Sequence, residues 1–262
     1  MEEKNKTNKK NILILSLLAV LIIAGIFVLI TLLPKNKEKN VYLVANTNKT
    51  EYLVGETVKI EMAKVDKDGN ADCDANLKLT INGIKKKDII KSSACKLGIN
   101  IIPDYLFSFK PDKTGTFKIK LKDLDTKVTT TRYFDVVNEK SLDITRKMDL
   151  RINLKKGNTF PVRIHVKANK DYSGEISDLV PNGITIKWQG EAKVEGNKII
   201  WHVNLKAGET KDFIYEYSVN NPIPTTYSFG EDNEWTVITT NQEQKMEIKI
   251  QEIIKKLNEK NN

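Results

Sequence analysis

Apolar and polar residues alternate along most of the chain after residue 40. Val58, Ile60 and Met62 are separated by charged residues, so their side chains fall on one face of an extended strand. The same alternation recurs at residues 77–81, 105–109, 117–121, 160–166, 199–205 and 213–219. Turn-forming pairs such as Asn82-Gly83 separate these runs, and no long helical period intervenes. The pattern predicts strands joined by short turns.

Strand after strand with short turns is typical of antiparallel β-sandwiches. The chain has 262 residues, a length that suits two domains of ordinary size. We therefore predict an all-β fold with two tandem immunoglobulin-like sandwiches, one at residues 41–138 and one at residues 139–240.

The longest alternating stretch lies at residues 201–219. It reads as two strands joined by a Lys-Ala-Gly-Glu-Thr turn, and this turn suggests a hairpin. Its large apolar residues, Trp201, Phe213, Tyr215 and Tyr217, fit the space between two packed sheets. We predict that these four side chains lie in the core. The alternative is an exposed aromatic platform that stacks on sugars.

The N-terminal region contains a segment of a different kind. Residues 12–33, which begin with Ile12 and end with Leu33, contain no charged residue. A helix of this length spans about 33 Å, enough to cross the hydrocarbon core of a bilayer. We predict a transmembrane helix here, preceded by a cytoplasmic tail (residues 1–11) and followed by a polar linker (residues 34–40). A cleaved signal peptide and a buried core helix are the alternatives.

The last 22 residues, 241–262, combine two patterns. Met246, Ile250, Ile253 and Leu257 share one face of a helix, whereas Met246, Ile248 and Ile250 alternate as in a strand. We predict the end of a strand that passes into a short amphipathic helix. This helix would dock on its own domain or on a partner.

Cysteine use bears on the cellular compartment. The chain has two cysteines, Cys73 and Cys95, which flank a predicted strand. An even, small number of cysteines in an exported β-rich protein is typical of a disulfide, and two free buried thiols are the alternative. With the membrane segment, this pattern predicts a single-pass protein of the plasma membrane whose β-domains lie outside the cytoplasm.

The formal net charge of the chain is +9. A basic domain outside the membrane could bind anionic lipid headgroups, an acidic wall polymer or an envelope protein. The alternative is that lysine simply solvates the surface. No interleaving of aromatic and basic residues indicates nucleic-acid binding. The expected partners are thus the bilayer, through residues 12–33, and an envelope protein or polymer.

The sequence contains no constellation typical of catalysis. The turn at residues 66–74 is rich in aspartate, but Ala71 and Leu77 occupy positions where an EF-hand needs glycine and glutamate. An Asx-rich hairpin turn is favoured there over a cation site. His165 and His202 lie on the polar faces of different strands without a third ligand. We predict a protein that is not an enzyme and has no catalytic residue, cofactor or metal.

Two groups of motifs resemble known modules. Residues 52–71 contain Tyr-Leu-Val-Gly-Glu-Thr-Val, residues 107–122 contain Lys-Thr-Gly-Thr-Phe, and residues 132–137 read Arg-Tyr-Phe-Asp-Val-Val. Together they resemble macroglobulin-type and bacterial immunoglobulin-like modules. The Val-Pro-Asn-Gly strand at residues 180–183 and the Lys-Ala-Gly-Glu turn resemble the repeat sandwiches of prokaryotic surface proteins. No thioester Cys-Gly-Glu-Gln motif is present, so the resemblance does not imply protease trapping.

The resemblance implies a structural or binding role at a prokaryotic cell surface, as a spacer or adhesive arm. A second hypothesis is a subunit of an extracytoplasmic machine, such as a pilus or an archaellum stator. A third is an accessory to an enzyme that acts on wall polymers.

Overall fold

The computed structural model describes residues 41–66, 68–86, 88–99, 102–154, 159–220, 225–231 and 234–240. The predicted tail (1–11), membrane span (12–33), linker (34–40) and C-terminal segment (241–262) lie outside these residues. No helix in the described part of the chain is long and apolar enough to cross a membrane.

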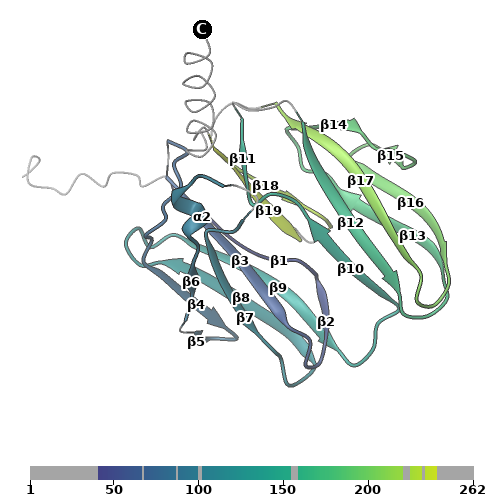
Figure 1. The fold of residues 1–262 in the computed structure, drawn as a ribbon, viewed down its shortest axis with the longest axis horizontal. Helices are drawn as coiled ribbons and strands as arrows, with labels where there is room; N and C mark the ends of the chain where they lie inside the picture. The colour runs from purple at the N-terminus through teal and green to yellow at the C-terminus, as the bar shows by residue number, and fades with distance from the viewer. Residues whose placement is uncertain are drawn as a thin grey trace, which may run out of the picture. The chain divides into compact units, whose positions relative to one another are not determined.

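The first half of the described chain folds into two facing sheets (Figure 1). One sheet has the order β1-β3-β7-β6, and the other has the order β2-β9-β8-β4-β5. The bounds of these elements, including the helix α2, are β1 (Tyr42–Thr47), β2 (Glu51–Leu53), β3 (Val58–Val65), β4 (Leu77–Ile81), β5 (Ile84–Lys86), β6 (Ile90–Lys91), α2 (Ser93–Lys96), β7 (Tyr105–Phe109), β8 (Gly115–Asp123) and β9 (Thr129–Val137).

The second half contains three sheets in the described residues. Their orders are β10-β12-β17-β14, β13-β16-β15 and β11-β19-β18. The strands are β10 (Leu142–Lys147), β11 (Arg151–Asn153), β12 (Phe160–Ala168), β13 (Tyr172–Leu179), β14 (Ile184–Trp188), β15 (Lys193–Glu195), β16 (Lys198–Leu205), β17 (Thr210–Val219), β18 (Thr226–Phe229) and β19 (Trp235–Thr240). The all-β prediction is confirmed, and the alternating runs fall on strands.

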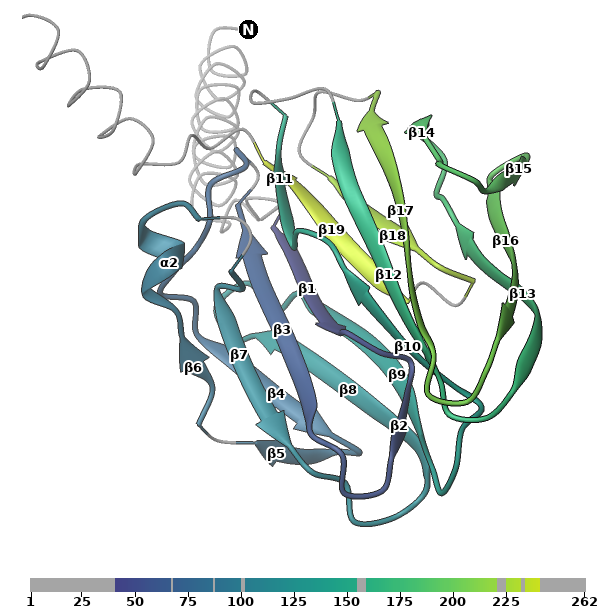
Figure 2. The same ribbon diagram turned by 45° about the vertical axis from the view of Figure 1, so that its right-hand side comes forward.

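Two hydrophobic cores follow from the alternation. In the first half, Ile60 and Met62 of β3 pack against residues of β8 and β9, and all are buried. Towards its end β3 is buried on both faces, because Ala63 and Val65 join the core of the second half. Figures 1 and 2 show the reason, since β1 lies between β3 and β19. The two halves therefore share apolar packing.

The expectation of purely antiparallel sheets is wrong at two places. β2 runs parallel to β9, and β11 runs parallel to β19. In each half the first strand pairs antiparallel with a strand of one sheet (β1 with β3, β10 with β12). The chain then crosses to another sheet, where it forms β2 in the first half and β11 in the second. Because the chain keeps its direction when it crosses, it meets the last strand of that half in parallel.

The expected hairpin at residues 201–219 is also corrected. β16 pairs with β13 and β15, whereas β17 pairs with β12 and β14, so the Lys-Ala-Gly-Glu turn connects two different sheets. The side chains of the two strands face each other across the core instead of lying side by side. The Trp201 ring centroid lies 5.1 Å from that of Phe213 and 6.3 Å from that of Tyr215. The core prediction for Trp201, Phe213, Tyr215 and Tyr217 is confirmed, because all four are buried.

A β-bulge alters the edge strand β14. Ile186 pairs with Tyr217, but Trp188 pairs with Glu216, so one residue is inserted between them. The insertion turns Trp188 from the core face to the outer face of the sheet, where 51% of this residue is exposed.

Candidate functional site

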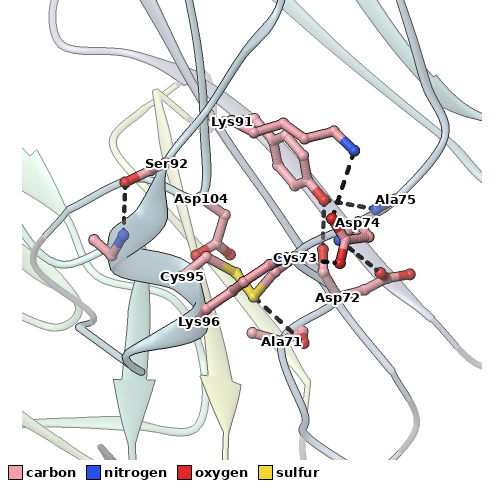
Figure 3. Close-up of a disulfide and its surroundings, with 12 residues drawn as sticks. Ala71, Asp72, Cys73, Asp74, Ala75, Lys91, Ser92, Cys95, Lys96 and Asp104 are labelled. Carbon is pink, nitrogen blue, oxygen red and sulfur yellow. Dashed lines mark hydrogen bonds and ion pairs between the residues drawn. A yellow bond between two sulfur atoms is a disulfide. The ribbon is translucent and has the colours of Figure 1, made fainter. Parts of the chain in front are cut away.

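The disulfide predicted from the two cysteines is present in the structure (Figure 3). Cys73 lies in the aspartate-rich turn at residues 66–74, and Cys95 lies in the helix α2. The bond joins residues 22 apart and fastens α2 to this turn. A cross-link that closes a loop of this length stabilises a fold by about 3 kcal/mol. The cysteines flank three strands, β4 to β6, instead of the single strand expected.

The helix α2 is also fixed by hydrogen bonds. The hydroxyl of Ser92 accepts a hydrogen bond from the Ala94 amide at 3.2 Å and so caps the helix. Nearby, the Tyr105 hydroxyl donates to the carbonyl oxygen of Asp72 at 2.6 Å and accepts from the amide of Ala75 at 2.7 Å. The region around the disulfide is therefore a fixed part of the first half (Figure 3).

The aspartate-rich turn closes a hairpin, as expected. Val65 bridges Ala71, and the Asp66 carboxylate accepts hydrogen bonds from the amides of Asp68 (2.9 Å) and Asn70 (2.8 Å). This carboxylate caps its own turn, as aspartate commonly does. The described residues contain no group of three or more His, Cys, Asp or Glu that could hold a metal ion.

The two histidines do not meet. His165 lies on β12 with its Nδ1 atom 2.8 Å from Asp212, and His202 lies on β16 with its Nδ1 atom 3.4 Å from Glu175. These strands belong to different sheets, and each histidine has its own acidic neighbour.

A buried ionic network joins the sheets of the second half. The guanidinium of Arg146 donates to both carboxylate oxygens of Asp178, at 2.5 and 2.7 Å, and to Glu234 at 2.8 Å. The Tyr215 hydroxyl donates to Asp178 at 2.7 Å. Burial alone would lower the pKa of Arg146, but the charge of Asp178 raises it. The backbone amide of Arg146 also donates to the carbonyl oxygen of Asn48 in the first half.

The contacts between the first and the second half of the described chain form a junction. A second ionic network crosses this junction near the loop between β1 and β2. Lys49 lies 2.6 Å from Glu56 and 2.7 Å from Asp143, and Lys140 lies 3.2 Å from Glu56 and 2.9 Å from Asp143. Burial tends to raise the pKa values of Glu56 and Asp143, but hydrogen bonds from Lys49 bring both below their usual range. Two cations and two anions thus link the two halves.

The junction also contains a side chain that forms the two hydrogen bonds that a neighbouring strand would form with a backbone. The side-chain amide of Asn46 donates to the carbonyl oxygen of Thr236 at 2.7 Å, and its oxygen accepts from the amide of Thr236 at 3.0 Å. Asn46 is fully buried. Arg132 on β9 donates to the hydroxyl of the same threonine. One residue of β1 therefore satisfies both backbone groups of a residue on β19.

A buried ion pair completes the junction. Arg151 on β11 lies 2.9 Å from Asp104, which precedes β7, and both side chains are almost fully buried. Attraction between the positive guanidinium of Arg151 and the carboxylate of Asp104 holds the pair. Burial raises the pKa of Asp104 to about 6, although the positive charge of Arg151 opposes the rise.

An open cleft lies beside these contacts, between the outer face of β3 and the outer face of the β10-β12-β17-β14 sheet. Its volume is about 530 Å³. Besides the buried Arg146, its lining includes three exposed basic residues, which project from β3, β10 and β12: Lys59, Lys147 and Arg163. Lys147 and Arg163 form no ion pair with any residue that the structure describes. The cleft therefore offers cationic side chains to a ligand.

Two acidic residues and a tryptophan also line this cleft. Burial raises the pKa values of Glu61 and Asp149, and Lys59 opposes the rise at Glu61. Trp235 is 2% exposed, and its indole Nε1 has no hydrogen-bond partner in the described part of the chain. The arrangement suits binding of a polar, anionic molecule and provides no nucleophile with an adjacent base.

Comparisons with known proteins give structural neighbours only. No protein-family model matches the sequence, and no curated protein is significantly similar to it. Among solved structures, the adhesin InvE of Yersinia pseudotuberculosis is 11% identical with a TM-score of 0.31, and the match covers 78% of this chain and 61% of that one. The Escherichia coli adhesin FdeC is 12% identical with a TM-score of 0.30, covering 76% of this chain and 63% of the other.

Escherichia coli α2-macroglobulin is also similar. It is 9% identical with a TM-score of 0.31, and the match covers 79% of this chain and 22% of the macroglobulin. This chain thus matches less than two thirds of the length of each of these structures.

Several residues of the junction and cleft were missed by the sequence analysis. Arg146 and Asp178 had a recognisable signal, because each occupies an inward position of an alternating strand between apolar residues. Opposite charges at two core positions indicate a buried pair. Asn46 gave no comparable signal, because its partner is a backbone group 190 residues away.

Proposed function

We propose that this protein is a membrane-anchored envelope protein with a structural and binding role, held by residues 12–33 and exposing both sandwiches outside the cytoplasm. The observation that carries the proposal is the junction, where hydrogen bonds and ion pairs such as Asn46–Thr236 and Arg151–Asp104 fix the two halves around an open cleft. A fixed junction suits an arm that presents a binding surface at a set distance from the membrane. The disulfide supports an oxidising compartment.

The proposed location predicts how the cysteines react in intact cells. A thiol reagent that cannot cross the membrane should label Cys73 and Cys95 only after a reductant has been added, because the two are bonded to each other. Labelling of lysates without reduction, combined with no labelling of reduced intact cells, would contradict the proposal. A Cys73→Ser/Cys95→Ser variant is the control for labelling of other groups.

The proposed ligand is an acidic envelope polymer that binds in the cleft, since Lys59, Lys147 and Arg163 line it. Arg163→Glu in the full-length protein should weaken binding to polygalacturonate at least tenfold, a loss of about 1.4 kcal/mol. The matched control is Lys120→Glu, a charge reversal on β8, which belongs to the other sheet of the first half. Added salt should weaken wild-type binding, because exposed charges are screened.

Arg163→Glu and Lys120→Glu change the net charge equally. A difference between them therefore distinguishes binding in the cleft from attraction of the polymer to the net charge of the protein. Equal losses of affinity in the two variants would show that the cleft is not the binding site. Equally tight wild-type binding to neutral dextran would argue against recognition by charge.

A further inference from the structure

A row of outward side chains crosses the β10-β12-β17-β14 sheet from the cleft towards its edge strand β14. Lys147 of β10 pairs with Arg163 of β12, which pairs in turn with Ile214 of β17. Directly opposed residues of antiparallel strands point to the same face, so these side chains stand side by side, about 5 Å apart from strand to strand. All three line the cleft. The lining of the cleft thus reaches β17, the strand next to β14 (Figure 2).

Trp188 lies at the end of this row. It is the last residue of β14 and pairs with Glu216 of β17. A Cβ atom placed on Gly190 would lie 3.5 Å from the Trp188 ring and 3.7 Å from the carbonyl oxygen of Ile214. The ring therefore lies beside Gly190, next to the β17 residue that ends the row. It is held against this turn and yet remains half exposed.

The exposure of Trp188 suits it to contact a ligand. The sequence has three tryptophans, and the other two, Trp201 and Trp235, are buried. An aromatic ring carries partial negative charge on its faces, and the C–H groups on the face of a sugar ring carry partial positive charge, so the two stack. One exposed apolar residue needs no explanation by itself. Trp188 is distinguished by its place at the end of a row that leads into the cleft.

Carboxylates stand among the cations of this surface. Glu216 lies beside Trp188, and Asp212, two residues before Ile214, lies 2.8 Å from His165. The other charged residues are Lys187 and Glu191, which are exposed near Trp188 in the chain, and the cleft residues Lys59, Glu61, Arg146, Lys147, Asp149 and Arg163, of which Arg146 binds Asp178 and Glu234. The surface therefore carries both signs of charge.

This mixture of charges favours a sugar over a simple polyanion. Sugar hydroxyl groups donate hydrogen bonds to carboxylates and accept them from lysine and arginine, so they suit both kinds of side chain. A chain of phosphates would pair with Arg163 but would be repelled by Glu216. A sugar that carries a carboxylate meets the cations of the row and the ring of Trp188 together.

We propose that Trp188 is a stacking platform for a sugar ring, and that the polymer bound in the cleft is an acidic polysaccharide whose carboxylates pair with Arg163 and Lys147. This inference rests on the proposed binding of an acidic polymer in the cleft. Trp188 stands three strand spacings from Lys147, about 14 Å, so one extended polysaccharide reaches both. The bulge in β14 turns the tryptophan to the face on which this polymer lies.

The first test compares variants of the full-length protein. Trp188→Ala should weaken binding to polygalacturonate about fivefold, because it removes the stacking surface. Trp188→Phe, which keeps an aromatic ring, should retain most of the affinity. The matched control is Tyr133→Ala, since Tyr133 is 58% exposed on β9 in the first half, and this variant should bind as tightly as wild type. Binding to inorganic polyphosphate, which has no sugar ring, should be unchanged in Trp188→Ala.

A second test needs no substitution. Because Trp201 and Trp235 are buried, quenching of tryptophan fluorescence by acrylamide reports mainly on Trp188. Saturating polygalacturonate should lower the quenching constant about twofold, because a stacked sugar covers one face of the indole. Polyphosphate should leave the constant unchanged. Undiminished quenching in the presence of bound polygalacturonate would overturn the platform.

Arg163→Glu separates this inference from the proposed function. If Arg163→Glu weakens binding to polygalacturonate and Trp188→Ala does not, the polymer site in the cleft stands and the platform is overturned. If neither variant weakens binding, the polymer site fails and the platform fails with it. Equal losses for polygalacturonate and polyphosphate in Trp188→Ala would show that the ring does not recognise sugar. A loss in Trp188→Ala alone would overturn the pairing with Arg163.

Discussion

We expect Arg146→Met to lower the free energy of unfolding by about 3 to 5 kcal/mol, because the change leaves a buried carboxylate without its cation. Asp178 is fully buried and receives two hydrogen bonds from Arg146. The remaining donor, the Tyr215 hydroxyl, cannot neutralise the charge. Urea unfolding of the full-length chain at neutral pH, followed by tryptophan fluorescence, measures the loss.

The matched control is Arg163→Met on the neighbouring strand β12. Arg163 is exposed and forms no ion pair among the described residues, so the same chemical change should alter the stability by less than about 0.5 kcal/mol. Similar losses in the two variants would show that the ionic network contributes nothing beyond the side-chain volume.

We expect Arg151→Met to destabilise the protein by about 3 to 5 kcal/mol at pH 7, with a smaller loss at pH 5. The pKa of Asp104 is already about 6 in the folded protein, above its ordinary value of 3.8. A raised folded pKa means that the native state binds the proton more tightly, so the contribution to stability is lost as pH rises through that pKa. Removing Arg151 raises this pKa further, and protonation at pH 5 restores much of the stability. Unfolding at both pH values provides the measurement.

A double variant isolates the titration of this carboxyl group. Arg151→Met/Asp104→Asn has no carboxyl at the site, so its stability relative to wild type should lack the pH-dependent loss of the single variant. A loss in Arg151→Met that is equal at pH 5 and pH 7 would show that Asp104 does not titrate in this interval.

The sequence predicted the strands and the core well, because alternation reports which face of a strand is buried. Ile60 and Met62 and the aromatic residues of β16 and β17 lie inside, as their spacing required. The pairing of those strands was predicted wrongly. A short glycine-containing turn fits both a hairpin and a connection between sheets, and only contacts with β12 and β13 select the second.

Trp188 shows a second limit of local pattern. Ile184, Ile186 and Trp188 alternate regularly, which would place the tryptophan in the core, but the bulge before Trp188 turns it outward. A bulge depends on how a strand aligns with its neighbour, and no residue near Trp188 records that alignment. The cleft was beyond prediction for a similar reason, because its lining comes from β3, β10, β12, β17 and β19.

The sequence by itself predicted that residues 41–240 are all-β, where most of the strands run and which side chains fill the cores, and it favoured a bond between Cys73 and Cys95 over two free thiols. These features depend on residue type and on a spacing of two residues, because side chains two residues apart in a strand lie on the same face. Only the tertiary structure decided the junction, where Asn46 pairs with Thr236 and Arg151 with Asp104. Such contacts join residues far apart in the chain, and their strength comes from burial, which arises only when both halves pack together.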